Sequence, residues 1–231
     1  MEASDLPDAD HAVDRRCNAG ADLRHCVAVG FFERNRKELI DRGIDPVRLP
    51  PGQYLTERFP VLHVGDVPTY APGEWNLTIR GLVDHPFTID LDELKAMPAV
   101  ELTFDIHCVT KWSKFDTTWK GVRVRELLDR AGVQPTATHV MEHAEHGYTT
   151  NLPIADITTD QAIVAYEFEG EEIEPIHGGP VRIVVPHLYF WKSAKWVRAL
   201  ELRDRDAAGF WEQNGYHMYG NPFIEQRHWG D

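Results

Sequence analysis

Short segments that alternate apolar and polar residues dominate the hydrophobic pattern of this chain. Residues 75–80 alternate as a half-buried strand does, and the Gly81 to Pro86 segment predicts a turn into a second strand over 87–89. Residues 100–106 predict a strand that delivers His107 and Cys108 at its end. Further strands are expected at 139–143, 162–168, 181–185 and 197–202.

Helices are fewer and short. Residues 33–40 suit a helix closed by Gly43, and Asp90–Glu93 resembles a capping box for a helix that ends before Pro98. Residues 124–131 are amphipathic, with Gly132 at the expected C-cap position. Because strands outnumber helices and do not alternate regularly with them, the pattern predicts an α+β fold on mixed or antiparallel sheets.

The chain divides into a tail and one domain. Residues 1–30 are rich in Asp and Ala and show no sustained period, which predicts a loose acidic N-terminal tail. No internal repeat or second linker interrupts the remainder. We therefore expect a single domain over 31–231.

Charge, hydropathy and cysteine content limit the kinds of partner and the cellular location that we expect. The chain has 231 residues, 24 Lys and Arg against 37 Asp and Glu, and a net charge of −13, which argues against nucleic acid or an anionic membrane as the main partner. No run reaches the ~18 apolar residues of a membrane span, so no integral membrane segment is expected. The three cysteines form no Cys-x-x-Cys pair, and no apolar segment follows Arg15-Arg16. These features predict a cytoplasmic protein.

One stretch contrasts with the acidic average. Residues 175–200 contain no Asp or Glu but hold His177, Arg182, His187, Lys192, Lys195 and Arg198. Gly178-Gly179 would let backbone amides approach a ligand, and Ser193 offers a hydroxyl. The stretch either binds a phosphate or another anion, or is a solvated basic face, and the residues alone leave both open.

Cys108 is the second chemical candidate, because a strand end can point a thiolate into a cleft. His107, Lys111 and Lys114 would favour the ionised sulfur needed for metal ligation or nucleophilic attack. The alternative is a small apolar residue of the core.

The third candidate is the histidine-rich segment 139–148. On a strand, His139 and His143 share a face and could ligate zinc together with Cys108, as in a zinc-dependent hydrolase. No His-Glu-x-x-His motif is present, and motifs for nicotinamide, P-loop, esterase or attached haem chemistry are absent from the sequence.

Four segments together resemble the sulfite oxidase family of molybdopterin enzymes, which includes the catalytic subunit of the bacterial periplasmic methionine sulfoxide reductase. They are Trp75–Val83, Cys108–Ser113, Trp119–Val122 and the 177–195 region, and the resemblance covers about residues 50–205. It implies a β-rich mixed-sheet domain of the sulfite oxidase type that binds molybdenum and molybdopterin. The implied enzyme transfers an oxygen atom to or from a small oxyanion, sulfoxide or N-oxide and exchanges electrons with a separate partner protein.

The resemblance also implies roles for single residues. Cys108 would ligate the molybdenum, and Lys111 and Tyr148 would act with it in catalysis. Lys111, Lys114, Tyr148 and Arg227 are candidates for steering an anionic substrate. The cofactor contacts would be Arg58, Leu62, His63, Cys108, His143, His177, Arg182, Ser193, Ala194 and Lys195.

One departure from the family pattern leaves the reaction open. Thr110 stands where the reductase branch usually has Glu, so the direction of oxygen transfer and the substrate are open. The alternatives to the oxidoreductase are a zinc-dependent hydrolase using Cys108 with His139 or His143, and a non-catalytic carrier of molybdopterin.

Overall fold

The computed structural model describes residues 35–231, and the predicted acidic tail over 1–30 lies outside this range. The chain divides into two units, Met1–Val47 and Arg48–Asp231. In the described part of the first unit, residues 35–41 are helical and Gly43 follows with a φ of +72°. This confirms the expected short helix over its described residues.

A six-stranded sheet forms one half of the second unit. Its main path runs β1 (Tyr54–Leu55), β5 (Trp112–Arg123), β8 (Ile163–Phe168) and β10 (Arg182–Val184). Outside this path, β4 (Ala99–His107) pairs with β5, and β9 (Glu171–Glu172) pairs with β8. Among the described residues, β1 pairs with β5 in parallel. The pairs β4 with β5, β5 with β8 and β8 with β10 are antiparallel.

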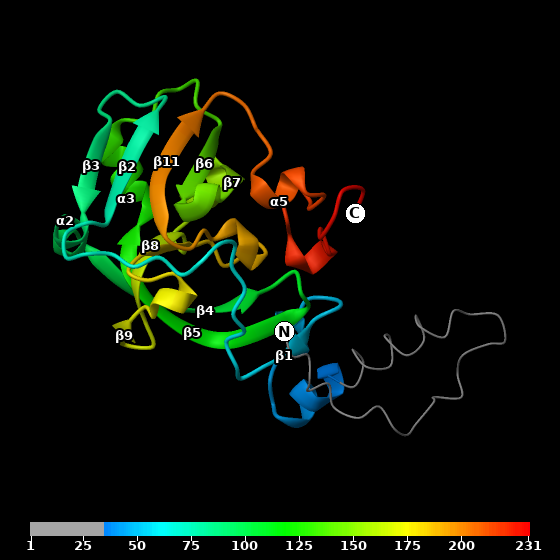
Figure 1. The fold of residues 1–231 in the computed structure, drawn as a ribbon. Coiled ribbons are helices and arrows are strands. Elements are labelled where there is room, and N and C mark those ends of the chain that lie inside the picture. The colour runs from blue at the N-terminus through cyan, green and yellow to red at the C-terminus, as the bar shows by residue number, and fades with distance from the viewer. Residues whose placement is uncertain (1–34) are drawn as a thin grey trace. The chain divides into compact units, whose positions relative to one another are not determined.

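A five-stranded sheet forms the other half. Its order is β3 (Phe87–Asp90), β2 (Asn76–Gly81), β11 (Val197–Arg203), β6 (His139–Ala144) and β7 (Thr149–Pro153). Figure 1 shows β11 in orange between β2 and β6, although more than a hundred residues separate it from β2. Strands β11 and β2 run parallel and the other pairs are antiparallel, so both sheets are mixed.

Four short helices accompany the sheets. They are α2 (Leu91–Ala96), α3 (Val124–Ala131), α4 (Ile154–Ile157) and α5 (Phe210–Gln213), and single 3₁₀ turns lie between strands. Asp90 and Glu93 form the predicted capping box, and Gly132 ends α3 in the left-handed conformation. None of the helices among residues 35–231 has both the length and the apolar character to cross a membrane.

The core consists of two hydrophobic clusters. The larger one joins the five-stranded sheet to α3 and includes Leu77, Ile79, Leu127, Val140 and Leu200. The smaller one gathers around Trp119, Ile106, Ala165 and Phe190, and it includes Cys108.

The predicted α+β class with mixed sheets is confirmed, and so is each strand expected from alternation. The sequence pattern missed β5, the longest strand, because polar residues such as Ser113 and Thr117 occupy buried positions there and hide the alternation of its two faces.

Candidate functional site

Cys108 lies in the turn that joins β4 to β5. The Cys108 amide donates to the Trp112 carbonyl, and the Lys111 amide donates back to the Cys108 carbonyl at 3.0 Å. Lys111 accommodates the turn with a φ of +78°. These hydrogen bonds fix the backbone on both sides of Cys108. Cys108 thus follows the end of a strand, as the sequence predicts.

The Cys108 thiol is nearly enclosed, with 8% of the residue exposed. Its Sγ lies 3.2 Å from Thr110 Oγ1. Burial raises the pKa of the thiol, while the Thr110 hydroxyl and the more distant charges of Arg227 and Lys195 act in the opposite direction. A positive centre placed against the sulfur would favour the thiolate, which is the form that ligates metals.

A cavity of about 270 Å³ opens beside this sulfur. Eight aromatic side chains contribute to its wall: Phe59, Trp112, Tyr148, Phe190, Trp191, Trp196, Trp211 and Tyr216. Its remaining lining consists of Pro60, Leu62, His63, Val64, Cys108, Val109, Thr110, Arg182, Ser193 and Lys195. The cavity thus combines a thiol, two cations and an apolar wall, the usual composition of a cofactor or ligand site.

Arg182 and Lys195 supply the positive charge of the cavity. Arg182 is 1% exposed, and its guanidinium donates to the backbone carbonyls of His177 and Ser193. The Lys195 ammonium donates to the Ile176 carbonyl at 2.8 Å. Burial lowers the pKa of Arg182 to about 9, and burial together with Arg182 lowers that of Lys195 to about 7.

Neither cation forms an ion pair with a carboxylate among residues 35–231. Two desolvated positive charges without a counter-ion are costly, and an anionic ligand between them would remove that cost. The structure therefore favours the anion-binding interpretation of the acid-free stretch over that of a solvated basic face.

The turn over Ser193, Ala194 and Lys195 is held from several sides. Ser193 Oγ accepts from the Val185 amide at 2.9 Å, and the Ser193 carbonyl accepts from Arg182. The Ala194 amide donates to Glu142 Oε2. The three residues that the resemblance implies as cofactor contacts thus form one fixed turn.

His177 lies beside this turn and stacks on Phe59, with ring centroids 4.1 Å apart. Burial lowers its pKa, and Lys195 and Arg182 lower it further. Its Nδ1 is buried and makes no hydrogen bond within the described part of the chain. His177 is not among the residues that line the cavity, although the resemblance implies it as a cofactor contact.

Several predicted residues lie elsewhere. Leu62 and His63 line the cavity, but Arg58, Lys111 and Lys114 do not, and Lys114 donates to the Glu57 carbonyl. His143 bonds Glu201 at 2.7 Å and is also outside the lining. Arg227 donates to the Val109 and Pro51 carbonyls, so it braces the backbone next to Cys108.

The histidines expected for zinc do not join Cys108. No group of three His, Cys, Asp or Glu side chains within residues 35–231 is arranged to hold a metal ion. His139 bonds Thr138, and His143 bonds Glu201. The structure gives the zinc interpretation no site.

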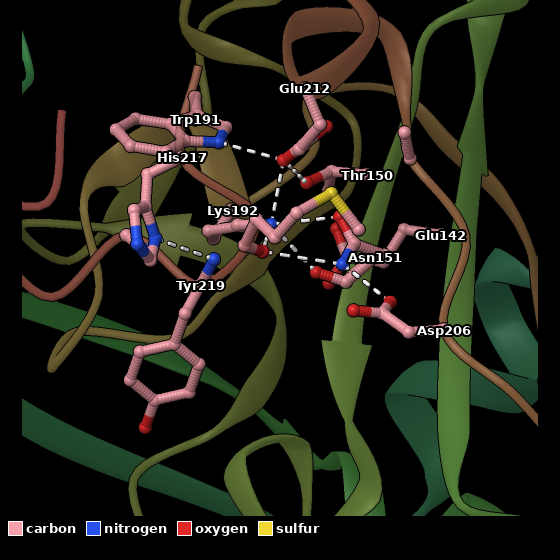
Figure 2. A network of polar contacts seen from close by, with 12 residues as sticks. Glu142, Thr150, Asn151, Trp191, Lys192, Asp206, Glu212, His217 and Tyr219 are labelled. Atoms are coloured by element: carbon pink, nitrogen blue, oxygen red, sulfur yellow. Dashed lines mark hydrogen bonds and ion pairs between the residues drawn. The ribbon is translucent and has the colours of Figure 1, made fainter. Parts of the chain in front are cut away.

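Sequence reasoning missed the aromatic wall. Trp211 and Tyr216 stack with ring centroids 4.9 Å apart, and Tyr216 meets Trp191 edge-on at 5.1 Å. Behind the wall, Glu212 Oε1 accepts from Trp191 Nε1 and lies 2.6 Å from Lys192 Nζ, as Figure 2 shows. The only sequence signal was the clustering of Trp and Tyr around 211–219.

Residues 64–211 match the family described as the oxidoreductase molybdopterin binding domain. The chain belongs to this family. It is a molybdopterin-dependent oxidoreductase of the sulfite oxidase type, and its cofactor contains molybdenum. Thirteen of the eighteen residues that line the cavity, with Cys108, Arg182 and Lys195 among them, lie within the matched residues.

Individual relatives agree with this membership. The uncharacterised oxidoreductase YuiH of Bacillus subtilis is 50% identical over 78% of this chain and 91% of its own length. The mitochondrial sulfite oxidase of Drosophila melanogaster is 29% identical over 74% of this chain. The methionine sulfoxide reductase catalytic subunit MsrP of Gluconobacter oxydans is 27% identical over 70%. This molybdopterin oxidoreductase spans 35% and 59% of the lengths of the latter two.

A solved structure shares the fold. The sulfane dehydrogenase SoxCD from Paracoccus pantotrophus superposes with a TM-score of 0.58 and 22% identity, covering 63% of this chain and 42% of that one. The predicted fold of the sulfite oxidase type is confirmed.

The donor set of this molybdopterin oxidoreductase fits its cofactor. A soft thiolate suits molybdenum, and the buried Arg182 with the partly buried Lys195 suits an anionic pterin phosphate.

Proposed function

We propose that this enzyme transfers an oxygen atom to or from a small sulfur- or nitrogen-centred substrate and exchanges electrons with a separate partner protein. One observation supports the proposal most directly: a buried thiol, the buried Arg182 and the partly buried Lys195 face the same aromatic cavity, and neither cation pairs with a carboxylate of the described residues. The names of the relatives, a sulfite oxidase and a sulfoxide reductase, support the same class of reaction.

The chain's own residues would hold the cofactor. Cys108 would be the metal ligand, with Thr110 3.2 Å from its sulfur as a hydrogen-bond partner. Arg182, Lys195 and Ser193 would bind the anionic part, and their fixed backbone contacts would keep them in place before the cofactor arrives. When bound, molybdenum-molybdopterin supplies the two-electron redox change that the side chains cannot supply.

Two tyrosines at the cavity have different tasks. The Tyr148 hydroxyl donates to the Trp191 carbonyl at 2.5 Å, so Tyr148 would position the wall. Tyr216 lines the cavity and its hydroxyl forms no hydrogen bond with another residue of the described range, so it can donate to a substrate oxygen. Trp191 and Trp211 beside it would exclude water.

The proposed oxygen transfer releases or takes up two electrons, so it requires a second redox partner. Oxidation of sulfite consumes water and releases sulfate, two protons and two electrons. Reduction of a sulfoxide or N-oxide takes up two electrons and two protons and releases water. The electrons enter or leave through a separate redox protein in this proposal.

The test combines cofactor analysis with substitution of the thiol. Purified protein is analysed for molybdenum and pterin, then assayed with sulfite and ferricyanide, and with dimethyl sulfoxide or trimethylamine N-oxide and a reduced viologen. Wild type should hold both components near stoichiometry and turn over one substrate. Cys108→Ser should lose at least ~100-fold of the activity while retaining pterin.

Thr103→Ala, on the solvent side of β4, serves as the control and should leave activity unchanged. Full cofactor with no turnover on any of the three substrates would favour the carrier. Zinc in place of molybdenum would contradict the proposed function.

A further inference from the structure

A carboxyl group lies behind the cofactor cradle, which we define as Arg182 with the turn Ser193–Lys195. Glu142 is in the middle of β6, where it pairs with Leu200 of β11 and Thr150 of β7. It is fully buried. Its neighbour His143 bonds Glu201, whereas the Glu142 side chain accepts from the Ala194 amide of the cradle.

The side chain of Glu142 makes a single hydrogen bond within the described residues. Its Oε2 accepts from the Ala194 amide at 2.9 Å, and its Oε1 is buried with no partner in residues 35–231. The Ala194 carbonyl in turn accepts from the Ile183 amide at 2.9 Å. Glu142 therefore ties the centre of the turn to the five-stranded sheet, whereas Ile183 ties it to the six-stranded one.

The charges around Glu142 leave it without an ion pair. Lys192 would be a partner, but its ammonium lies 2.6 Å from Glu212 and also donates to Asn151 (Figure 2). Arg182 and Lys192 favour the ionised form of Glu142, Glu212 opposes it, and the phenol of Tyr148 lies within electrostatic range. Burial outweighs these effects and raises the pKa of Glu142 to about 8.

We propose that Glu142 is a positioning residue of the cofactor cradle and holds the Ser193–Lys195 turn in its protonated, neutral form. A neutral carboxyl still accepts from the Ala194 amide through one oxygen. An ionised one would place a negative charge directly behind the cations that bind the anionic cofactor and would weaken their hold. The proposal rests on the cofactor and not on the direction or substrate of the reaction.

The amount of pterin that stays bound to the protein tests the role of Glu142 and needs no activity assay. Holoenzyme is dialysed at about pH 6.5 and about pH 9, and the pterin that remains per chain is measured over time, together with the melting temperature. Wild type should lose pterin several-fold faster at the higher pH. Glu142→Gln, which keeps the acceptor and cannot ionise, should retain pterin with a much smaller pH dependence.

Two further variants complete the test. Glu142→Leu removes the acceptor and should lose pterin fast at both pH values. Glu101→Gln, an exposed carboxylate on β4, is the matched control and should behave as wild type. Within the cradle, Lys195 also titrates in this range, but its effect is common to wild type and Glu142→Gln, so the difference between the two reports Glu142. The pKa of His177 is lowered below its ordinary 6.5, so His177 does not titrate between the two pH values.

The proposal fails if Glu142→Gln keeps the wild-type pH dependence, or if it loses pterin as fast as the leucine variant while both remain folded. If the leucine variant does not fold, the comparison of wild type with Glu142→Gln still decides. A wild-type protein that carries pterin but shows no oxygen transfer would overturn the proposed function and leave this inference standing.

Discussion

Buried ionisable side chains concentrate around one turn of this molecule. Arg182, Lys192, Glu142 and Glu212 are each at most 1% exposed, and only Lys192 and Glu212 pair directly. Burying an unpaired charge costs several kcal/mol, so these residues reduce stability unless a ligand or a proton neutralises them. At the scale of single residues, the site is built for a bound anion.

Glu142→Gln should stabilise the protein in a pH-dependent way. The folded-state pKa of about 8 lies above the ordinary 4.5, so the folded state binds more protons between these values and stability falls as pH rises through this window. The glutamine variant lacks this loss. Its advantage in free energy of unfolding should grow from near zero at about pH 4.5 to roughly 3–5 kcal/mol above pH 8.

Urea denaturation of the cofactor-free proteins at several pH values measures this difference. A constant offset between the two curves, or an advantage that shrinks with rising pH, would show that Glu142 is ionised throughout. Glu101→Gln is again the control, since it is exposed.

At the scale of elements, α5 has four residues and depends on tertiary contacts for its position. Glu212 places its carboxylate 2.6 Å from Lys192 and accepts from Thr150 and Trp191 (Figure 2). Gly209 allows the close approach, because a Cβ there would lie 2.5 Å from the Thr149 carbonyl oxygen. The buried pair thereby fixes Trp211 and Tyr216 at the cavity.

The two members of this pair should be strongly coupled. Lys192→Met and Glu212→Leu alone should each cost about 3–5 kcal/mol, because each leaves the other charge buried without its partner. The double variant should be several kcal/mol more stable than the sum of the single losses predicts. A thermodynamic double-mutant cycle by urea unfolding measures the coupling, and additive losses would contradict it.

Strands β5 and β8 meet at a position that tolerates only glycine. A Cβ on Gly121 would lie 2.2 Å from the Val164 carbonyl oxygen, at the register shift between the two strands. Gly121→Ala should therefore destabilise the protein by at least ~2 kcal/mol, measured as the midpoint of urea unfolding. Thr103→Ala on β4, which loses only one surface hydrogen bond, should cost less than about 1 kcal/mol.

At the scale of the whole molecule, the cavity lies where several parts of the chain converge. Cys108 comes from a turn of the six-stranded sheet, Tyr148 precedes β7 of the five-stranded one, and the Ser193–Lys195 turn lies between β10 and β11. Trp211 and Tyr216 come from the C-terminal segment. Stability and cofactor binding are therefore linked through one region.

Inorganic sulfate should stabilise the cofactor-free protein. An anion between Arg182 and Lys195 binds only the folded state, so at about tenfold its dissociation constant it should add about 1.4 kcal/mol, or roughly 3–5 °C in melting temperature. Sodium chloride at equal ionic strength should have a smaller effect. In Lys195→Met, the extra stabilisation by sulfate over sodium chloride should largely disappear. If this extra stabilisation is as large as in wild type, the anion binds elsewhere.

The amino-acid sequence by itself determined most of the local structure. Alternation predicted the strands at 75–80, 100–106 and 139–143, and the capping box and Gly132 marked two helix ends, because these signals act between residues close in the chain. It also singled out Cys108 and the acid-free stretch around Arg182. β5 escaped because buried positions of this strand carry Ser113, Thr117 and Gly121, so its burial does not appear as an alternation of apolar and polar residues.

Tertiary structure alone decided what surrounds those residues. It directed His143 toward Glu201 and away from the cavity, and it placed Glu142, one position earlier, behind Ala194. It brought Trp211 and Tyr216 to a thiol more than a hundred residues earlier in the chain. Such contacts depend on the order of strands in the sheets and on the interactions of buried charges. Both involve residues far apart in the chain, so the local sequence pattern does not reveal them.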